Sequence, residues 1–262
     1  MPFAHVNGQK LHYEDTGGDG PVIVFSHGLL MDGSMFAPQI EALRGQWRCI
    51  TWDERGHGQT ADPAACAPFT YYDSANDLAA LLEHLGVQQA VLAGMSQGGY
   101  LSLRCALTHP ERVRALVLID TQALQEDPRK MVGHEALLKA WLEGGLSDEI
   151  AAVVAHTILG DGWEGTPQWQ AKWRQVTAPN LLQCFTTLGS RDDISERIGA
   201  ITVPALVVHG SLDHAIDLER AQAMAAALPG ARLVEVPGAG HASNLTHPEP
   251  VNAALKAFLD HL

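Results

Sequence analysis

Positive charge is scarce in this chain of 262 residues. Lysine and arginine together number 17 against 30 aspartates and glutamates, which gives a formal net charge of −13. A nucleic-acid interface needs clustered cations, and anionic lipid surfaces attract them, so the composition argues against both partners. The apolar runs are also shorter than a membrane span requires, so we expect no membrane association.

Cysteine is sparse as well. The chain has four cysteines, widely spaced and without a Cys-x-x-Cys pair, as expected of reduced thiols. The N-terminus carries no basic segment followed by an apolar one, so we expect no signal peptide. Together these features predict a cytoplasmic location. The cysteines are Cys49, Cys66, Cys105 and Cys184.

Sequence motifs for cofactors are missing too. No Gly-x-Gly-x-x-Gly follows the early strand, and the chain has no P-loop lysine. His209, Asp213 and His214 lie close together in sequence, but no second cluster with ligand spacing accompanies them. We therefore expect neither a nucleotide cofactor nor a metal ion.

The chain does contain a regular alternation of buried strands and amphipathic helices. Short apolar runs are typical of strands that are buried on both faces, and a 3.6-residue apolar period is typical of helices. Their alternation predicts an α/β fold, with a mostly parallel twisted sheet and helices on both faces. The segments in the first half are 22–26, 71–85, 89–94, 97–108 and 115–119.

The alternation stops after Asp120. Residues 122–198 contain helical stretches without a convincing strand, and they hold four of the six tryptophans. We therefore predict three segments: a first core part at 1–121, a helical lid at 122–198 and a second core part at 199–262. A lid above the edge of a sheet would place aromatic side chains beside a substrate pocket.

The motif Gly-Met-Ser-Gln-Gly at 94–98 joins the strand 89–94 to the helix 97–108. The two glycines allow a sharp turn that exposes the hydroxyl of Ser96 at the sheet edge. A serine hydroxyl is a weak nucleophile unless a base, an orienting acid and oxyanion donors surround it. Ser96 is the candidate nucleophile, and the rest of the chain offers candidates for the other roles.

His241 and Asp213 are the candidate base and acid. His241 follows the strand 232–236 in a glycine-rich loop, and Asp213 follows the strand 205–208. Open α/β sheets place their sites at such carboxyl ends, and the order Ser96, Asp213, His241 is typical of nucleophile-elbow enzymes. His241 would take the serine proton and return it to the leaving group, while Asp213 orients the imidazole.

Two other aspartates compete with Asp213 for the role of the acid. Asp120 also ends a strand, so it stays open as an alternative acid reached from a neighbouring position. Asp217 is better interpreted as the N-cap of the helix 218–228.

The backbone amides of Leu29 and Gln97 are the candidate oxyanion donors. Gln97 directly follows the nucleophile, and Leu29 lies in the loop after the strand 22–26. His27 precedes this loop, and we interpret it as a structural histidine that braces the loop.

These motifs resemble the α/β-hydrolase superfamily, in its lid-bearing branch of small serine esterases and lactonases. The overall pattern is similar to 3-oxoadipate enol-lactonases and related carboxylesterases. The resemblance implies a cofactor-free enzyme, and it assigns the acidic and basic loop at 53–58 to positioning rather than chemistry. The residues that carry it are His27-Gly28, the loop 53–58, the motif 94–98, Asp213 and Gly240-His241.

The function expected is a serine hydrolase that cleaves a small carboxylic ester or lactone through an acyl-enzyme. Serine at position 96, where an aspartate would act in dehalogenases and epoxide hydrolases, argues against those reactions. The same triad leaves open carbon–carbon bond hydrolysis of a dione, or perhydrolase chemistry with peroxide replacing water. A ligand-binding relative without catalysis is the alternative outside enzymology.

The positive charges in the lid make an anionic substrate an open alternative, although most of these side chains are better explained as solvated residues on helix faces. The cations are Arg129, Lys130, Lys172 and Arg174.

Overall fold

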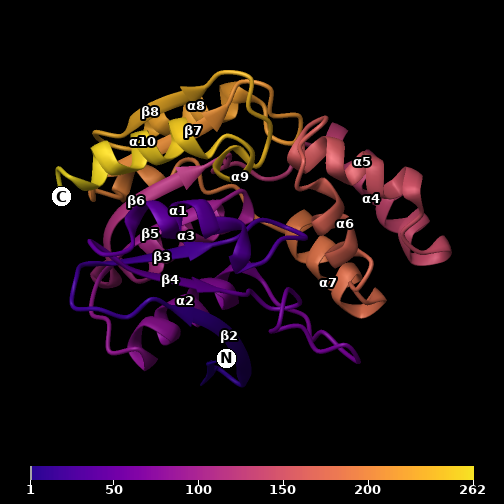
Figure 1. The fold of residues 1–262 in the computed structure, drawn as a ribbon, viewed down its shortest axis with the longest axis horizontal. Coiled ribbons are helices and arrows are strands. Elements are labelled where there is room, and N and C mark those ends of the chain that lie inside the picture. The colour runs from indigo at the N-terminus through magenta and orange to yellow at the C-terminus, as the bar shows by residue number, and fades with distance from the viewer. Residues whose placement is uncertain (1) are drawn as a thin grey trace.

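The computed structural model describes residues 2–262, and within them the strands form one eight-stranded sheet (Figure 1). Its order is β1-β2-β4-β3-β5-β6-β7-β8. Strand β2 pairs antiparallel with both β1 and β4, and the remaining six strands are parallel to one another. The predicted α/β fold with a mostly parallel sheet is confirmed. The strands are β1 (Phe3–Val6), β2 (Gln9–Asp15), β3 (Val22–Ser26), β4 (Arg48–Trp52), β5 (Ala90–Met95), β6 (Val113–Ile119), β7 (Ala205–Gly210) and β8 (Arg232–Val236).

Helices cover both faces of this sheet because successive strand residues point to opposite sides. Ile23 and Phe25 of β3 belong to a buried cluster with α1 and α10, whereas Val24 belongs to a second cluster with α2, α3 and α8. Both faces are therefore apolar, as a central parallel strand requires. The core helices are α1 (Ala37–Leu43), α2 (Tyr71–His84), α3 (Gln97–Thr108), α8 (Leu218–Ala227), α9 (Ser243–Thr246) and α10 (Pro248–Leu259).

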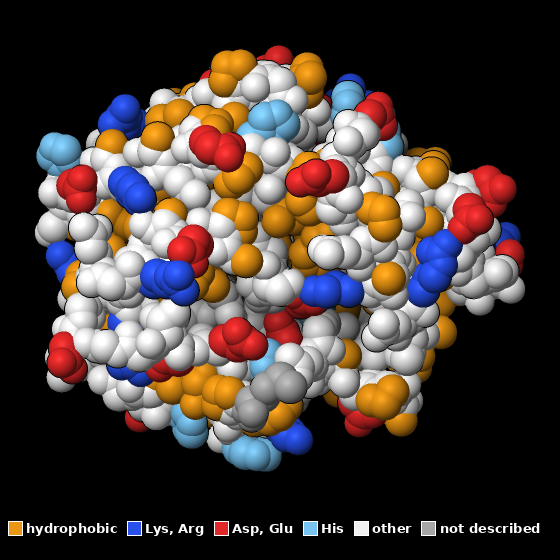
Figure 2. All heavy atoms as spheres, in the orientation of Figure 1, with side chains coloured by type: hydrophobic (Ala, Val, Ile, Leu, Met, Phe, Trp, Pro, Cys, Tyr) orange, Lys and Arg blue, Asp and Glu red, His pale blue; other side chains and the backbone are white. Residues whose placement is uncertain are grey.

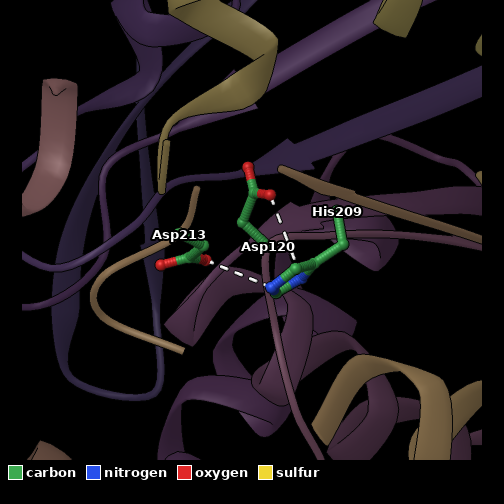
Figure 3. Close-up of side chains that lie close together, drawn as sticks. All are labelled: Asp120, His209 and Asp213. Atoms are coloured by element: carbon green, nitrogen blue, oxygen red, sulfur yellow. Dashed lines mark ion pairs between the residues drawn. The ribbon is translucent and has the colours of Figure 1, made fainter. Parts of the chain in front are cut away.

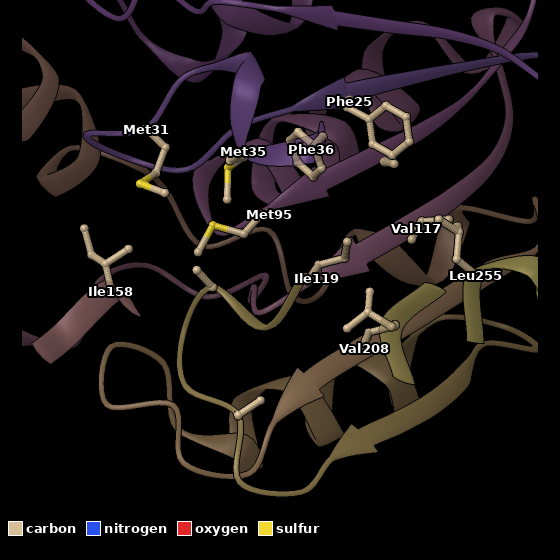
Figure 4. Close-up of a cluster of buried hydrophobic side chains, with 14 of the residues drawn as sticks. Phe25, Met31, Met35, Phe36, Met95, Val117, Ile119, Ile158, Val208 and Leu255 are labelled. Atoms are coloured by element: carbon tan, nitrogen blue, oxygen red, sulfur yellow. The ribbon is translucent and has the colours of Figure 1, made fainter. Parts of the chain in front are cut away.

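The cluster on the α1 and α10 face runs from the core to the region of the candidate nucleophile. Figure 4 shows it extending from Phe25 and Leu255 to Met95 and Ile158. Met95 precedes the candidate nucleophile, and Ile158 belongs to the lid. The lid is thus joined to the core by continuous apolar packing.

The lid consists of helices between β6 and β7, where residues 120–204, all of them described, contain no strand. Figure 1 shows these helices gathered on one side of the core. Trp141, Trp169 and Trp173 are buried in the cluster that the lid shares with the core. Among the described helices, none combines the length and apolar character needed to cross a lipid bilayer. The lid helices are α4 (Pro128–Gly144), α5 (Asp148–Leu159), α6 (Thr166–Trp173) and α7 (Ala178–Gly189).

Candidate active site

Ser96 forms the turn between β5 and α3, with a backbone at φ 54° and ψ −118°. A positive φ is unfavourable for serine, and strain of this kind is typical of functional turns. A Cβ atom on Gly94 would collide with the backbone of Gly98, and one on Gly98 with the carbonyl of Ser26. Glycine is needed at both positions because α3 begins so close to β5 and β3.

The structure brings Ser96, His241 and Asp213 together. The hydroxyl of Ser96 donates to Nε2 of His241 at 2.9 Å, and Nδ1–H of His241 donates to Oδ2 of Asp213 at 2.8 Å. All three side chains are largely buried. With Nδ1 carrying its proton toward the carboxylate, Nε2 can accept the serine proton. The arrangement can therefore activate Ser96 for attack on a carbonyl carbon.

The electrostatics of the pair favour this proton transfer. Burial alone would lower the pKa of His241, but the charge and hydrogen bond of Asp213 outweigh burial and raise the pKa above the ordinary 6.5. Burial likewise opposes ionisation of Asp213, yet the charge and hydrogen bond of His241 hold its pKa below the usual range. Asp213 therefore stabilises the imidazolium that forms when His241 takes the proton of Ser96.

Asp120, the alternative acid, lies beside Asp213 and makes no hydrogen bond to His241. Its Oδ1 accepts the N–H of Gly210 and its Oδ2 accepts the N–H of Ser243, each at 2.8 Å. Asp120 thereby connects the end of β6 to the loops that carry the triad acid and base. Burial and the negative charge of Asp213 raise the pKa of Asp120 to about 6.

Asp217 is the N-cap residue of α8, as predicted, but its side chain makes no cap hydrogen bond. Its carboxylate instead accepts from Nζ of Lys130 in the lid, at 2.7 Å. The predicted N-cap position is confirmed, but the carboxylate pairs with Lys130 on α4 instead of bonding to the helix N-terminus.

His209 lies beside Asp213, and Figure 3 shows dashed lines from its ring to Asp120 and to Asp213. Its Nε2–H donates to the carbonyl of Ile216 at 2.9 Å and lies 3.4 Å from Oδ2 of Asp213. The possible metal-ligating atoms of these three side chains lie within 4.8 Å of one another. The hydrogen bonds that already engage both carboxylates and Nε2 favour a positioning role over metal binding.

The candidate oxyanion donors lie on two elements beside Ser96. Gln97 is the first residue of α3, where backbone N–H groups have no partner inside the helix. Its side chain is fixed, since Nε2 donates to Oε2 of Glu54 at 2.6 Å and Oε1 accepts from the hydroxyl of Tyr71 at 3.2 Å. Leu29 lines the same cavity as Ser96. Sequence reasoning missed the Glu54 contact, because no local pattern links residues so far apart.

The loop that carries Leu29 is held from two sides. His27 donates from Nδ1 to the carbonyl of Gly28 at 2.8 Å and accepts at Nε2 from the N–H of Glu54 at 2.9 Å. This is the bracing role predicted for His27. From the lid, the indole N–H of Trp173 donates to the carbonyl of Leu30 at 2.9 Å. No local sequence pattern predicts this second contact, because Trp173 and Leu30 lie far apart in the chain.

The loop at 53–58 positions its neighbours, in agreement with the prediction. Oδ1 of Asp53 accepts the N–H of Gly33 at 2.9 Å, and Oδ2 accepts the N–H of Gln59 and Nδ1–H of His12, also at 2.9 Å. Asp53 therefore links this loop to β2 and to the turn before α1.

Comparison with known proteins decides the family. A family model described as alpha/beta hydrolase fold matches residues 21–248. The chain belongs to this family. The resemblance predicted from the motifs is thereby confirmed, and the protein is a hydrolase of the α/β fold.

Its relatives carry names that refer to different hydrolase activities. An enol-lactonase from Burkholderia xenovorans is 30% identical with a TM-score of 0.87, and the match covers 99% of this chain and 100% of that one. A thermophilic esterase from Thermogutta terrifontis is 28% identical with a TM-score of 0.86, covering 98% and 95%. A protein named as a carbamate hydrolase (RutD) from a Caulobacter species is 28% identical, covering 95% of each chain.

A cavity of about 420 Å³ opens on Ser96 and His241 of this α/β hydrolase. Its polar members outside the triad include Glu126, Lys130 and His134, all on or just before the lid helix α4. Sequence reasoning named Lys130 among the lid cations but missed Glu126 and His134, because the lid pattern does not reveal which side chains face the core. The apolar wall contributed by the lid contains Leu137, Val153, Val154, Ile158, Phe185 and Leu188.

The four lid cations singled out from the sequence each form an ion pair. Their charges are therefore partly balanced by protein carboxylates, while Lys130 also lines the cavity beside Ser96, so an anionic substrate stays a prediction. The pairs are Arg129–Asp127, Lys130–Asp217, Lys172–Asp32 and Arg174–Asp148.

Proposed function

We propose that this α/β hydrolase cleaves a small carboxylic ester or lactone through an acyl-enzyme on Ser96. The observation that carries the proposal is the unbroken line of contacts from Asp213 through His241 to Ser96, at 2.8 and 2.9 Å. The line ends at a cavity that is large enough for a small substrate and is mostly apolar.

In the first half-reaction, Oγ of Ser96 attacks the carbonyl carbon while Nε2 of His241 takes the hydroxyl proton. The amides of Leu29 and Gln97 hold the resulting oxyanion. When the intermediate collapses, the bond to the leaving oxygen breaks and His241 gives its proton to that oxygen. A lactone would yield one hydroxy acid, because its leaving oxygen stays attached to the acyl chain.

In the second half-reaction, water replaces the alcohol. Nε2 of His241 takes a proton from water, the new oxygen attacks the acyl carbon, and the bond to Ser96 breaks as His241 returns the proton to Oγ. Asp213 keeps the imidazole oriented through both halves, since its contact with Nδ1 does not involve the reacting atoms.

Carbamate hydrolysis is the second candidate. The observation that favours it is the name of the curated relatives, which are called carbamate hydrolases at 27–29% identity. A carbamate presents the same carbonyl carbon to Ser96, so the geometry suits both classes. The ester or lactone is preferred because the structural relatives include an enol-lactonase and an esterase.

Release of p-nitrophenol separates these candidates. With p-nitrophenyl acetate, we expect a burst of one equivalent followed by turnover, and neither in Ser96→Ala. Ser102→Ala is the matched control, because Ser102 is a buried serine on α3 whose hydroxyl donates to the carbonyl of Gly98. A higher kcat/KM on a p-nitrophenyl carbamate than on the acetate would favour the second candidate. Equal rates in Ser96→Ala and the native enzyme would overturn both.

A further inference from the structure

A second cavity of about 560 Å³ lies next to the catalytic cavity. Leu30 lines both of them. Helix α7 also runs along both, with Leu181 on the second cavity and Phe185, one turn later, on the catalytic cavity. Two separate elements thus border both spaces, and Leu30 lines each of these spaces.

Leu30 is held in place at an energetic cost. Its backbone has φ 62°, a left-handed conformation that is unfavourable for leucine. Its carbonyl accepts the indole N–H of Trp173 at 2.9 Å, and both residues are buried. A glycine would satisfy the backbone without strain, so the retained side chain points to a role for the leucine side chain itself.

The two cavities differ in chemistry. The catalytic cavity is mostly apolar, whereas the second cavity is bordered by the ion pair of Asp32 and Lys172, at 2.6 Å, and by several polar side chains. Figure 2 shows the surface hollowed between the core and the lid, with charged side chains at the border. A substrate chain that entered this space would need a polar end.

Two residues on the second cavity retain unused hydrogen-bond acceptors. Within residues 2–262, Oδ1 of Asn180 and Nε2 of His57 are buried without a partner. Nδ1–H of His57 donates to the carbonyl of Arg55 at 2.9 Å, and burial lowers the pKa of His57 to about 3, so Nε2 is an acceptor. Both atoms lie just beneath the cavity surface, so a ligand that brings N–H or O–H donors would bond to them after a small movement of their neighbours.

We propose that Leu30 sets the length limit of the substrate by separating the catalytic cavity from this second cavity. With the leucine side chain removed, the second cavity becomes a subsite for the donor-bearing end of an elongated acyl chain. This inference rests on the proposed ester hydrolysis, and it extends that function by naming the residue that determines chain length.

The test compares p-nitrophenyl acetate with the p-nitrophenyl ester of 8-amino-8-oxooctanoic acid, whose chain ends in a primary amide. The readout is the ratio of kcat/KM for the long ester to that for acetate. In Leu30→Ala we expect this ratio to rise at least about tenfold, since each newly buried methylene changes binding by roughly fourfold. An unchanged ratio would overturn the proposal.

Three further variants sharpen this test. Leu137→Ala is the matched control, because it removes a leucine from the catalytic cavity away from the second cavity. A rise in its ratio equal to that of Leu30→Ala would mean that added volume alone is responsible. Adding Ala61→Phe to Leu30→Ala should abolish the gain, because Ala61 lines the second cavity. If Leu30→Ala folds poorly, Leu30→Gly provides the same opening with a relaxed backbone.

A binding measurement keeps the two proposals apart. Calorimetry with 8-amino-8-oxooctanoic acid requires no hydrolysis. We expect tighter binding to Leu30→Ala than to the native protein, and loss of that gain in the double variant with Ala61→Phe. Failure of acetate hydrolysis together with this binding pattern would overturn the proposed function alone. Identical binding by all three proteins would overturn the role of Leu30.

Discussion

The catalytic edge of the core and the lid wall of the catalytic cavity face the same space but are built differently. At the core edge, Asp213 and Asp120 are buried and bonded by backbone N–H groups or by the triad base. On the lid side, the wall is mostly apolar, and His134 keeps a buried Nδ1 atom without a partner among the described residues. The side chains of the core edge are therefore held by defined hydrogen bonds, whereas the lid wall contacts a substrate mainly through apolar packing.

This difference predicts that the core edge carries out the reaction and that the lid selects the substrate. Proton transfer requires distances near 2.8 Å and tolerates little displacement, so its side chains need several fixed partners. Apolar packing is less directional, so a lid wall can change its members without disturbing the triad. Changes at the core edge should therefore lower kcat, and changes on the lid should mainly alter KM and substrate choice.

The largest effect is expected from His241→Ala. It removes the base at the core edge, so esterase kcat should fall by about 10⁴-fold or more with KM changed little. Steady-state rates on p-nitrophenyl acetate measure this effect. His261→Ala is the control, because His261 is an exposed C-terminal histidine. A near-native rate for His241→Ala would contradict the whole comparison.

The pH profile should show the next largest effect. His241 must be neutral to accept a proton, and Asp213 raises the pKa of His241 above 6.5. Activity should therefore be full at higher pH and fall about tenfold per unit as the pH drops below the raised pKa. In Asp213→Asn the falling limb should move to lower pH, together with a lower maximal rate. A flat kcat/KM from pH 5 to pH 8 would contradict His241 as the base.

Asp120→Asn tests whether the core edge depends on its bracing carboxylate. The amide nitrogen of asparagine would face a backbone N–H, from Gly210 or Ser243, so one loop would shift. An unsatisfied buried group costs about 1–3 kcal/mol, which corresponds to roughly a 5- to 150-fold loss in kcat when the whole cost falls on the reacting geometry. Asp19→Asn on the exposed surface serves as control. Equal kcat for both variants would leave Asp120 without a positioning role.

Trp173→Phe tests the contact through which the lid reaches the core edge. The substitution removes the hydrogen bond to the carbonyl of Leu30 but keeps most of the buried ring. Because this loop carries the amide of Leu29, we expect kcat to fall about three- to tenfold, in line with one lost hydrogen bond. Trp163→Phe, in the same lid, should change kcat less. Equal kcat values for the two variants would mean that the hydrogen bond from Trp173 to Leu30 does not position the loop.

His134→Phe should have the smallest effect. The side chain lines the cavity from α4, and a phenyl ring keeps its size while removing its polar atoms. We expect kcat on p-nitrophenyl acetate to remain within about twofold, with KM changing by a few-fold in line with one altered apolar contact. A large loss of kcat would mean that His134 takes part in the reaction, and it would contradict the assignment of catalysis to the core edge alone.

The core edge was readable from the sequence because each of its parts has a local signature. A strand, a glycine-bounded serine and a helix predicted the turn at Ser96, and strand ends predicted the loops of Asp213 and His241. The lid lacked such signatures, because a 3.6-residue period gives the apolar face of a helix but not the direction in which that face is packed. The contacts of Trp173 and Asp120 depend on tertiary approach and carry no local pattern.

The central claim is that Ser96 becomes covalently acylated, and intact-protein mass spectrometry tests it most directly. Native enzyme mixed with p-nitrophenyl acetate and quenched in acid within one turnover should gain the mass of one acetyl group. Peptide mapping should place that group on Ser96, and Ser96→Ala should gain none. An acetyl group on another residue, or turnover without any covalent intermediate in the native enzyme, would contradict the account.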